Sequence, residues 1–206
     1  MKLLFAPQSP FARKVRIVSI ETGMHNQIKP EVVTMIPGKQ SDKNSANQIP
    51  LQKTPALILD NGIVLFDSRV ICEYLVGLGK QNDLIPIELN ERAQVMTLHA
   101  LADGMCDAAV SLRYETWLRP KSYRWKKWKD AQCAKIQAGI TWVEENPNCL
   151  SGPLNLAHVA LASCLGYINF RWPEAEWLVS THSLASWYEA IENRPSFYYT
   201  RPTIAA

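Results

Sequence analysis

Two short segments of the chain carry residues that could hold a small peptide. Thr54-Pro55 opens an apolar run. Because proline lacks an N–H, it belongs at a strand start or edge, and X-Pro is the one common place for a cis bond. Asp67-Ser68 precedes a helical pattern, and the free N–H groups of a helix N-terminus attract a carboxylate. The segment Lys53–Tyr74 therefore offers an unpaired strand edge beside a helix N-terminus, which suits a small peptide with a carboxylate.

The first eighty residues contain the elements that would position these groups. Ser9 is a good N-cap and Pro10 a favoured first helical residue, so a helix is expected from there to about Thr22. Asn61-Gly62 between two apolar runs predicts a hairpin. The expected elements are strands at 2–6 and 28–36, a polar loop at 37–46, hairpin strands at 56–59 and 63–66, and a helix at 68–78. This order predicts a mixed sheet covered by helices.

The pattern breaks at 77–90, which we interpret as a linker, and the rest of the chain has a different character. Helical periodicity dominates from there on, with prolines as stops. The expected helices span about 88–118, 123–145, 155–170 and 182–193. The sequence thus predicts an α/β domain at 1–79 followed by an all-helical domain at 86–206.

The composition is that of an ordinary globular protein. The chain has 206 residues, of which 47% are apolar and 20% charged, and its net charge of +3 is only a weak indication of an anionic ligand. No apolar run is long enough for a membrane span or a signal peptide. Five cysteines without a C-x-x-C pair and four scattered histidines favour reduced thiols and no metal site. A cytoplasmic location without membrane attachment is expected.

Several motifs, taken together, resemble cytosolic glutathione S-transferases. They are S-P-F-A-R-K-V-R-I at 9–17, K-T-P-A-L at 53–57, D-S at 67–68, and L-I-P with E-R-A at 84–86 and 91–93. The resemblance covers essentially the whole chain and is nearest to bacterial members with an S-P-F-x-R-K start. It implies a thioredoxin-like N-terminal domain, a helical glutathione-transferase C-terminal domain and a homodimer.

The resemblance also implies how glutathione would be held. Thr54 would pair through its backbone with the cysteinyl residue, and Pro55 in cis would present that edge. Ser68 would receive the γ-glutamyl carboxylate and Asp67 the γ-glutamyl ammonium. An ordinary strand-entry proline and an ordinary Asp-Ser helix cap remain open as alternatives.

The glycine carboxylate of glutathione would meet a basic or polar side chain in the preceding segment. Lys53 is the first choice, with Gln52 and Lys39 as lesser ones. An exposed lysine without a partner is the alternative.

Ser9 is the candidate catalytic residue. A thiol is mostly protonated at neutral pH, and a helix N-terminus with a hydroxyl donor lowers its pKa. Ser9 would donate a hydrogen bond to the glutathione thiolate, which is the nucleophile. The alternative is an N-cap serine without chemistry. Arg13, one turn further, would add positive potential or simply be solvated.

In the second domain, Asp103 matches an aspartate that reaches the γ-glutamyl ammonium of the other subunit, so it implies a dimer; a surface aspartate is the alternative. Arg113, Tyr114 and Trp117, together with Phe11, are the expected wall of a pocket for a small hydrophobic electrophile. Aromatic residues at helical spacing are more often core.

One departure from the family concerns a late helix that often begins S/T-x-x-D, a capping box. Here Asn155 and His158 occupy the two positions. Asn155 can still cap, whereas His158 offers no carboxylate, so a weaker cap is expected.

The function expected from these residues is conjugation of glutathione to a hydrophobic electrophile. Glutathione-dependent disulfide reduction and a non-catalytic regulatory binding role remain as alternatives. The stretch Arg119–Lys129 is basic with interleaved aromatics, as in nucleic-acid binders. Trp125 and Trp128, three residues apart, could instead both face the core with the cations in water. That account is favoured, and nucleic acid is not the expected partner.

Overall fold

The computed structural model describes residues 1–38, 49–79 and 83–203. The chain forms two compact units, one of Met1–Ile87 with Pro195–Ala206 and the other of Glu88–Arg194. The sequence analysis had assigned all of 86–206 to the helical domain, whereas the last residues make their contacts with the first unit. Most of the expected loop at 37–46 lies outside the described residues.

The first unit is built on a four-stranded mixed sheet in the order β2-β1-β3-β4. Its strands are β1 (Lys2–Phe5), β2 (Lys29–Val32), β3 (Ala56–Ile58) and β4 (Val64–Leu65). β1 pairs in parallel with β2 and antiparallel with β3, and β3 pairs antiparallel with β4. The strands are shorter than the apolar runs suggested. Gly62, with φ 86°, closes the β3–β4 turn by donating to the Leu59 carbonyl at 2.9 Å.

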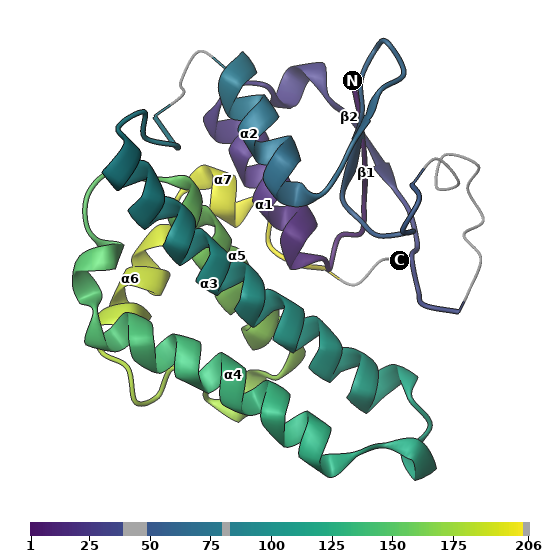
Figure 1. Cartoon of the computed structure of the whole chain (residues 1–206), viewed down its shortest axis with the longest axis vertical. Coiled ribbons are helices and arrows are strands. Elements are labelled where there is room, and N and C mark those ends of the chain that lie inside the picture. Colours follow the sequence, from purple (N-terminus) through teal and green to yellow (C-terminus); the bar gives the residue numbers. More distant parts are fainter. Residues whose placement is uncertain (39–48, 80–82, 204–206) are drawn as a thin grey trace. The chain divides into compact units, whose positions relative to one another are not determined.

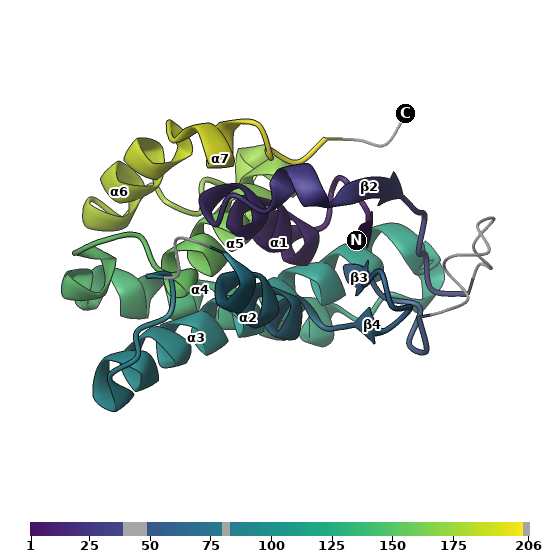
Figure 2. The ribbon, with the colours of Figure 1, turned by 90° about the horizontal axis from the view of Figure 1, so that it is seen from above.

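Two helices cover one face of this sheet, α1 (Pro10–Glu21) and α2 (Ser68–Leu78), with the short η1 turn (His25–Gln27) before β2 (Figures 1 and 2). α1 has Pro10 at its first position and ends before Gly23, whose φ is 72°. Its apolar positions Ala12, Val15 and Val18 are fully buried. The starts of both helices follow the strand ends directly, because Ser9 and Asp67 are good N-caps.

The basic side of α1 is not solvated, contrary to expectation. Arg13 and Lys14 are each only 1% exposed. Arg13 Nη2 donates to the Phe197 carbonyl at 3.0 Å, in the short helix α7 (Pro195–Tyr198), which packs against α1. Arg16 donates to the Tyr199 carbonyl at 3.2 Å in the same segment. The solvated interpretation of Arg13 is therefore wrong, because a segment far along the chain supplies acceptors for this face of α1.

The second unit is helical throughout its regular elements. They are α3 (Leu89–Arg113), the π-helical turn η3 (Tyr114–Leu118), η4 (Lys121–Tyr123), α4 (Lys126–Glu145), η5 (Pro147–Leu150), α5 (Leu156–Arg171), η6 (Pro173–Ala175) and α6 (Ser183–Glu192). α5 is buried on all sides from Leu156 to Ile168, as expected for a helix that is apolar all round. It packs along α3, which also packs against α4.

The connection between α3 and α4 corrects a second expectation. Trp125 is 62% exposed and Trp128 43%, so the account that turned both rings toward the core is wrong. Trp125 precedes α4 instead of lying within it, and helical spacing therefore does not place the two rings on one face. Glu115, buried at 3% exposure, holds the connection: its carboxylate accepts from the Trp125 N–H and from Arg119 Nε, both at 2.6 Å.

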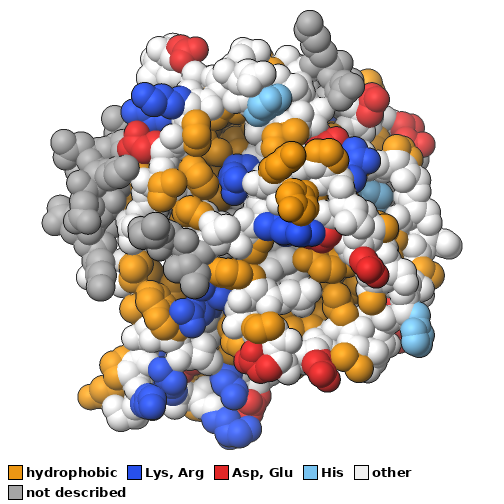
Figure 3. Space-filling view, turned by 180° about the vertical axis from the view of Figure 1, so that it is seen from behind, with side chains coloured by type: hydrophobic (Ala, Val, Ile, Leu, Met, Phe, Trp, Pro, Cys, Tyr) orange, Lys and Arg blue, Asp and Glu red, His pale blue; other side chains and the backbone are white. Residues whose placement is uncertain are grey.

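Lys and Arg side chains gather at this end of the helical unit. In Figure 3, which views the molecule from behind, they lie beside hydrophobic side chains at the lower left. The charged residues Arg124, Lys126, Lys127 and Lys129 are all exposed there.

Candidate functional site

Strand register alone brings three parts of the predicted site to one edge of the sheet. Leu4 pairs with Ala56, and Leu57 pairs with Leu65. The end of β1, the start of β3 and the end of β4 therefore share an edge, which is where Ser9, Thr54 and Ser68 follow or precede their strands. Both α1 and α2 begin at this edge, so two helix N-termini contribute positive potential to it.

The segment before β3 presents a free backbone edge. The Thr54–Pro55 peptide bond is cis, as the resemblance implied. Pro55 is buried and Thr54 half-buried. Within the described parts of the chain, no hydrogen bond uses the Thr54 N–H or carbonyl. A backbone donor and acceptor are thus left for an extended ligand.

At the start of α2, the two residues of the Asp-Ser pair differ in exposure and in role. Asp67 is exposed and caps the helix, because its Oδ1 accepts from the Arg69 N–H at 3.0 Å. Ser68, the first helical residue, is buried with 2% exposure. The peptide bond between Phe66 and Asp67 is also cis. The cap interpretation therefore holds for Asp67, and the ligand role of Ser68 stays a prediction.

Ser9 caps α1 and is half-buried. Its Oγ accepts from the Ala12 N–H at 3.2 Å. A hydroxyl has one proton to donate besides its acceptor sites, and among the described residues nothing accepts that proton. Capping and hydrogen-bond donation to a ligand are therefore compatible.

The residues considered for the glycine carboxylate lie in the loop before Thr54 or outside the described chain. Lys53 and Gln52 are exposed, and Gln52 has φ 47°. Lys39 lies outside the described residues.

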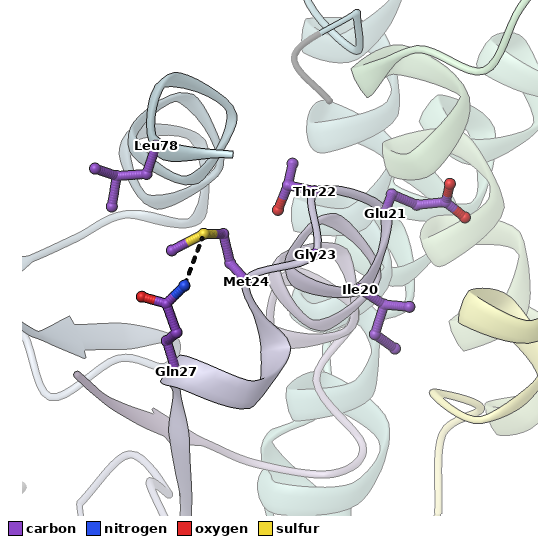
Figure 4. Close-up of a pocket in the computed structure, with 7 residues that line it drawn as sticks. All are labelled: Ile20, Glu21, Thr22, Gly23, Met24, Gln27 and Leu78. Atoms are coloured by element: carbon purple, nitrogen blue, oxygen red, sulfur yellow. Dashed lines mark hydrogen bonds between the residues drawn. The ribbon is translucent and has the colours of Figure 1, made fainter. Parts of the chain in front are cut away.

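A surface pocket in this unit lies away from the predicted residues. It lies at the C-terminal ends of both helices, where Thr22 and Met24 follow α1 and Leu78 ends α2 (Figure 4). Gln27 Nε2 donates to Met24 Sδ at 3.7 Å at its border. None of the predicted site residues lines it.

Asp103 lies on α3 and is paired within its own helix. His99, one turn earlier and only 1% exposed, places Nδ1 at 3.6 Å from Asp103 Oδ2. Sequence reasoning missed His99, although its i, i+4 spacing from Asp103 was a usable signal. The Asp103 carboxylate is thus oriented by a buried partner.

The predicted pocket residues of the helical unit lie at the end of α3, and they are not core. Trp117 is 47% exposed, and Arg113 stacks on it with Cζ at 4.7 Å from the ring centroid. Burial lowers the pKa of Arg113, and the charge of Arg171 lowers it further. Burial raises the pKa of Tyr114. Arg171 was missed, because it lies far along the sequence on α5. Phe11, in the first unit, is half-buried.

Two broader expectations can be set beside the structure. No helix of the described chain is both long enough and apolar enough to span a membrane. In the same residues, no cluster of three or more histidine, cysteine or acidic side chains is placed to hold a metal ion.

Comparison with known proteins assigns the family. The family model described as glutathione S-transferase, N-terminal domain, matches residues 3–82. The uncharacterized GST-like protein YibF of Escherichia coli K12 is 32% identical over 206 residues, 98% of each chain. The chain belongs to the glutathione S-transferase family, with its thioredoxin-like N-terminal domain and largely helical C-terminal region.

Solved structures agree with this assignment. A glutathione transferase family member from Pseudomonas fluorescens Pf-5 with bound glutathione has a TM-score of 0.94 at 40% identity, covering 98% of this chain and 99% of that one. A second structure from that organism, with bound S-(propanoic acid)-glutathione, has a TM-score of 0.90 at 40% identity, covering 99% and 100%.

Proposed function

We propose that this protein is a glutathione transferase that joins the glutathione sulfur to a small hydrophobic electrophile. The observation that carries the proposal is the meeting of Ser9, Thr54 and Ser68 at one sheet edge, where two helices begin. The neighbour with bound glutathione supports the same ligand for this chain. The neighbour with a propanoic acid group on the glutathione sulfur supports a site that tolerates a substituent there.

Each end of the tripeptide would meet a different part of this edge. The Thr54 backbone would pair with the cysteinyl backbone, and the N-terminus of α2 at Ser68 would hold the γ-glutamyl carboxylate. Asp67 would take the ammonium, although its Oδ1 also caps the helix. Lys53 would meet the glycine carboxylate, with Gln52 as the lesser choice. The tripeptide would then lie with its sulfur toward the start of α1.

Ser9 would stabilise the thiolate. Its hydroxyl proton is not used by the contact with Ala12, so it can be donated to sulfur, and the positive end of α1 adds to the effect. The thiol proton leaves to solvent. The thiolate then attacks the electrophilic carbon, a carbon–sulfur bond forms, and the leaving group departs with its electron pair. The serine forms no covalent bond.

A homodimer in the cytoplasm completes the proposal. Asp103, oriented by His99, would reach the γ-glutamyl ammonium bound by the partner subunit. Arg113, Tyr114 and Trp117 would line the electrophile pocket, and the role expected for Phe11 stays a prediction.

The decisive experiment is Ser9→Ala, with Ser9→Thr as a control that keeps the hydroxyl. We expect the alanine variant to lose about a hundredfold in kcat with a chlorodinitrobenzene, the usual cost of one donor to a developing anion. Its Kd for glutathione, measured by calorimetry, should change less than about tenfold. Unchanged turnover in Ser9→Ala would place the chemistry elsewhere. Activity on a mixed disulfide but not on the chlorodinitrobenzene would assign disulfide reduction instead.

A second candidate function is favoured by one observation, the exposure of Trp125 and Trp128 among the cations of the α3–α4 connection. Basic surface with free aromatic rings is what single-stranded nucleic acids bind. Salt-dependent retention of an oligonucleotide, together with no calorimetric signal for glutathione, would favour this non-catalytic role.

A further inference from the structure

Two arginines of the helical unit lie at the ends of helices that pack along each other. Arg113 is the last residue of α3, and Arg171 is the last residue of α5. Each guanidinium lies over aromatic rings. Arg113 Cζ is 4.7 Å from the Trp117 ring centroid, and Arg171 Cζ is 4.9 Å from that of Phe170 and 5.3 Å from that of Tyr167.

The two charges influence each other without a carboxylate between them. The pKa of Arg113 is lowered first by burial and then by the charge of Arg171. Burial raises the pKa of Tyr167, which both arginines lower in turn. Neither arginine forms an ion pair with an acidic residue in the described part of the chain. Two cations that influence each other and lie over aromatic rings without a counter-charge favour binding of an external anion.

A simpler explanation for each arginine is the helix dipole. A cation in the last turn of a helix interacts favourably with the free carbonyls there. That effect accounts for one arginine on each helix, but not for the stacking of both guanidiniums on aromatic rings. A guanidinium that stacks on a ring keeps its N–H groups at the edge of its own plane. There two of them can donate parallel hydrogen bonds to one carboxylate. Arg113 Nε, for example, is buried and donates no hydrogen bond to any described residue.

We propose that Arg113 and Arg171 form a carboxylate subsite, and that the second substrate is an aromatic electrophile bearing that carboxylate. This inference rests on the proposed transferase function for its substrate role. The carboxylate is held between the two guanidinium forks, and the substrate ring lies against Trp117 and Phe170. Tyr114, in the turn η3 after α3, and Tyr167, on α5, border the subsite.

A binding experiment tests the subsite without any catalysis. Nitrobenzoate and nitrobenzamide have nearly the same shape and differ in charge, and their affinities can be measured by calorimetry or tryptophan quenching. We expect the unmodified protein to bind nitrobenzoate at least about tenfold more tightly than nitrobenzamide, and added salt to reduce the difference. Equal affinities, or binding of neither compound, would overturn the proposal.

Charge-removing variants then assign the preference to residues. Arg113→Gln and Arg171→Gln should each bring the two affinities to within about threefold of each other. Lys135→Gln removes one positive charge from an exposed position on α4 and should keep the preference. Thermal unfolding of each variant checks that it is folded. A preference that survives in both arginine variants would contradict the assignment, and Arg171→Lys, which keeps the charge but not the fork, should restore only part of it.

A turnover experiment separates this inference from the proposed function. A chloronitrobenzoate and the matching chloronitrobenzamide are compared by kcat/KM, each divided by its uncatalysed rate with glutathione. The benzoate should be favoured by the unmodified protein and lose that advantage in Arg171→Gln, while Lys135→Gln keeps it. If neither compound is turned over but nitrobenzoate still binds through the two arginines, the transferase function falls and the carboxylate subsite stands. If both compounds are turned over without a preference for the benzoate, the transferase function stands and the carboxylate subsite falls.

Discussion

The starts of α1 and α5 use the same capping chemistry and have different surroundings. Ser9 Oγ accepts from the Ala12 N–H at 3.2 Å, and Asn155 Oδ1 accepts from the His158 N–H at 3.1 Å. At α1 the cap is half-buried, and its hydroxyl proton remains available. At α5 the cap is half-buried too, and the ring of the buried His158 lies beside it. The same local signal is therefore compatible with the proposed ligand site in one unit and serves only the fold in the other.

His158 connects the start of α5 to the turn that precedes it. Its ring Nε2 lies 3.0 Å from the Cys149 carbonyl oxygen, which can only accept, so this nitrogen carries the proton. The ring also meets the edge of Trp187, with centroids 5.7 Å apart. The sequence analysis expected a weaker cap because the usual carboxylate is missing. The Asn155 cap is present, and the histidine ties the preceding turn to the helix in place of a carboxylate contact.

The largest effect is expected from His158→Ala. The substitution leaves the partly buried carbonyl of Cys149 without this donor and removes a ring that is 2% exposed. We expect the free energy of unfolding to fall by about 3 kcal/mol. Urea denaturation measures this loss, and the Kd for glutathione serves as the control, which should not change. A loss as small as that from a surface substitution would mean that His158 does not hold the start of α5 to the preceding turn.

Removing the two caps should have similar effects on stability and different effects on activity. Asn155→Ala should lower the free energy of unfolding by about 1 kcal/mol, within the usual range for an N-cap, and leave kcat unchanged. Ser9→Ala should destabilise by a similar amount, because both cap contacts are partly buried, while it abolishes most turnover. Thermal unfolding and steady-state kinetics on both variants make the comparison. Equal activity losses in the two variants would remove the distinction between the two helix starts.

The smallest effect is expected from pH. Burial lowers the pKa of His158, so the unfolded chain takes up a proton before the folded one as the pH falls. The stability from this residue is complete above about pH 6.5 and is lost as the pH falls toward the folded-state pKa. His158→Gln retains an N–H donor that does not titrate. The Tm of the unmodified protein should thus decline more steeply below about pH 6.5 than that of the variant; parallel declines would exclude His158 as the cause.

Much of the first unit and part of its candidate site follow from local sequence signals. The range of α2 was predicted to the residue, because Asp67 caps it and Gly79 follows its last residue, Leu78. The family resemblance implied that Ser9, Thr54 and Ser68 belong to one site, and the strand register brings the ends of their strands to one edge of the sheet. The roles of these residues with glutathione stay predictions.

The remaining features required the tertiary structure, because they depend on residues far apart in the chain. Arg13 is buried beside Phe197, 184 positions later, whose carbonyl accepts a hydrogen bond from it. Trp125 and Trp128 are exposed because α4 begins after the first of them, where the periodicity no longer applies. The charge of Arg171 influences the pKa of Arg113 because α5 packs along α3. Caps and turns involve neighbours within about four residues, so the sequence determines them by itself. Burial and the pairing of charges depend on what the rest of the chain brings into contact.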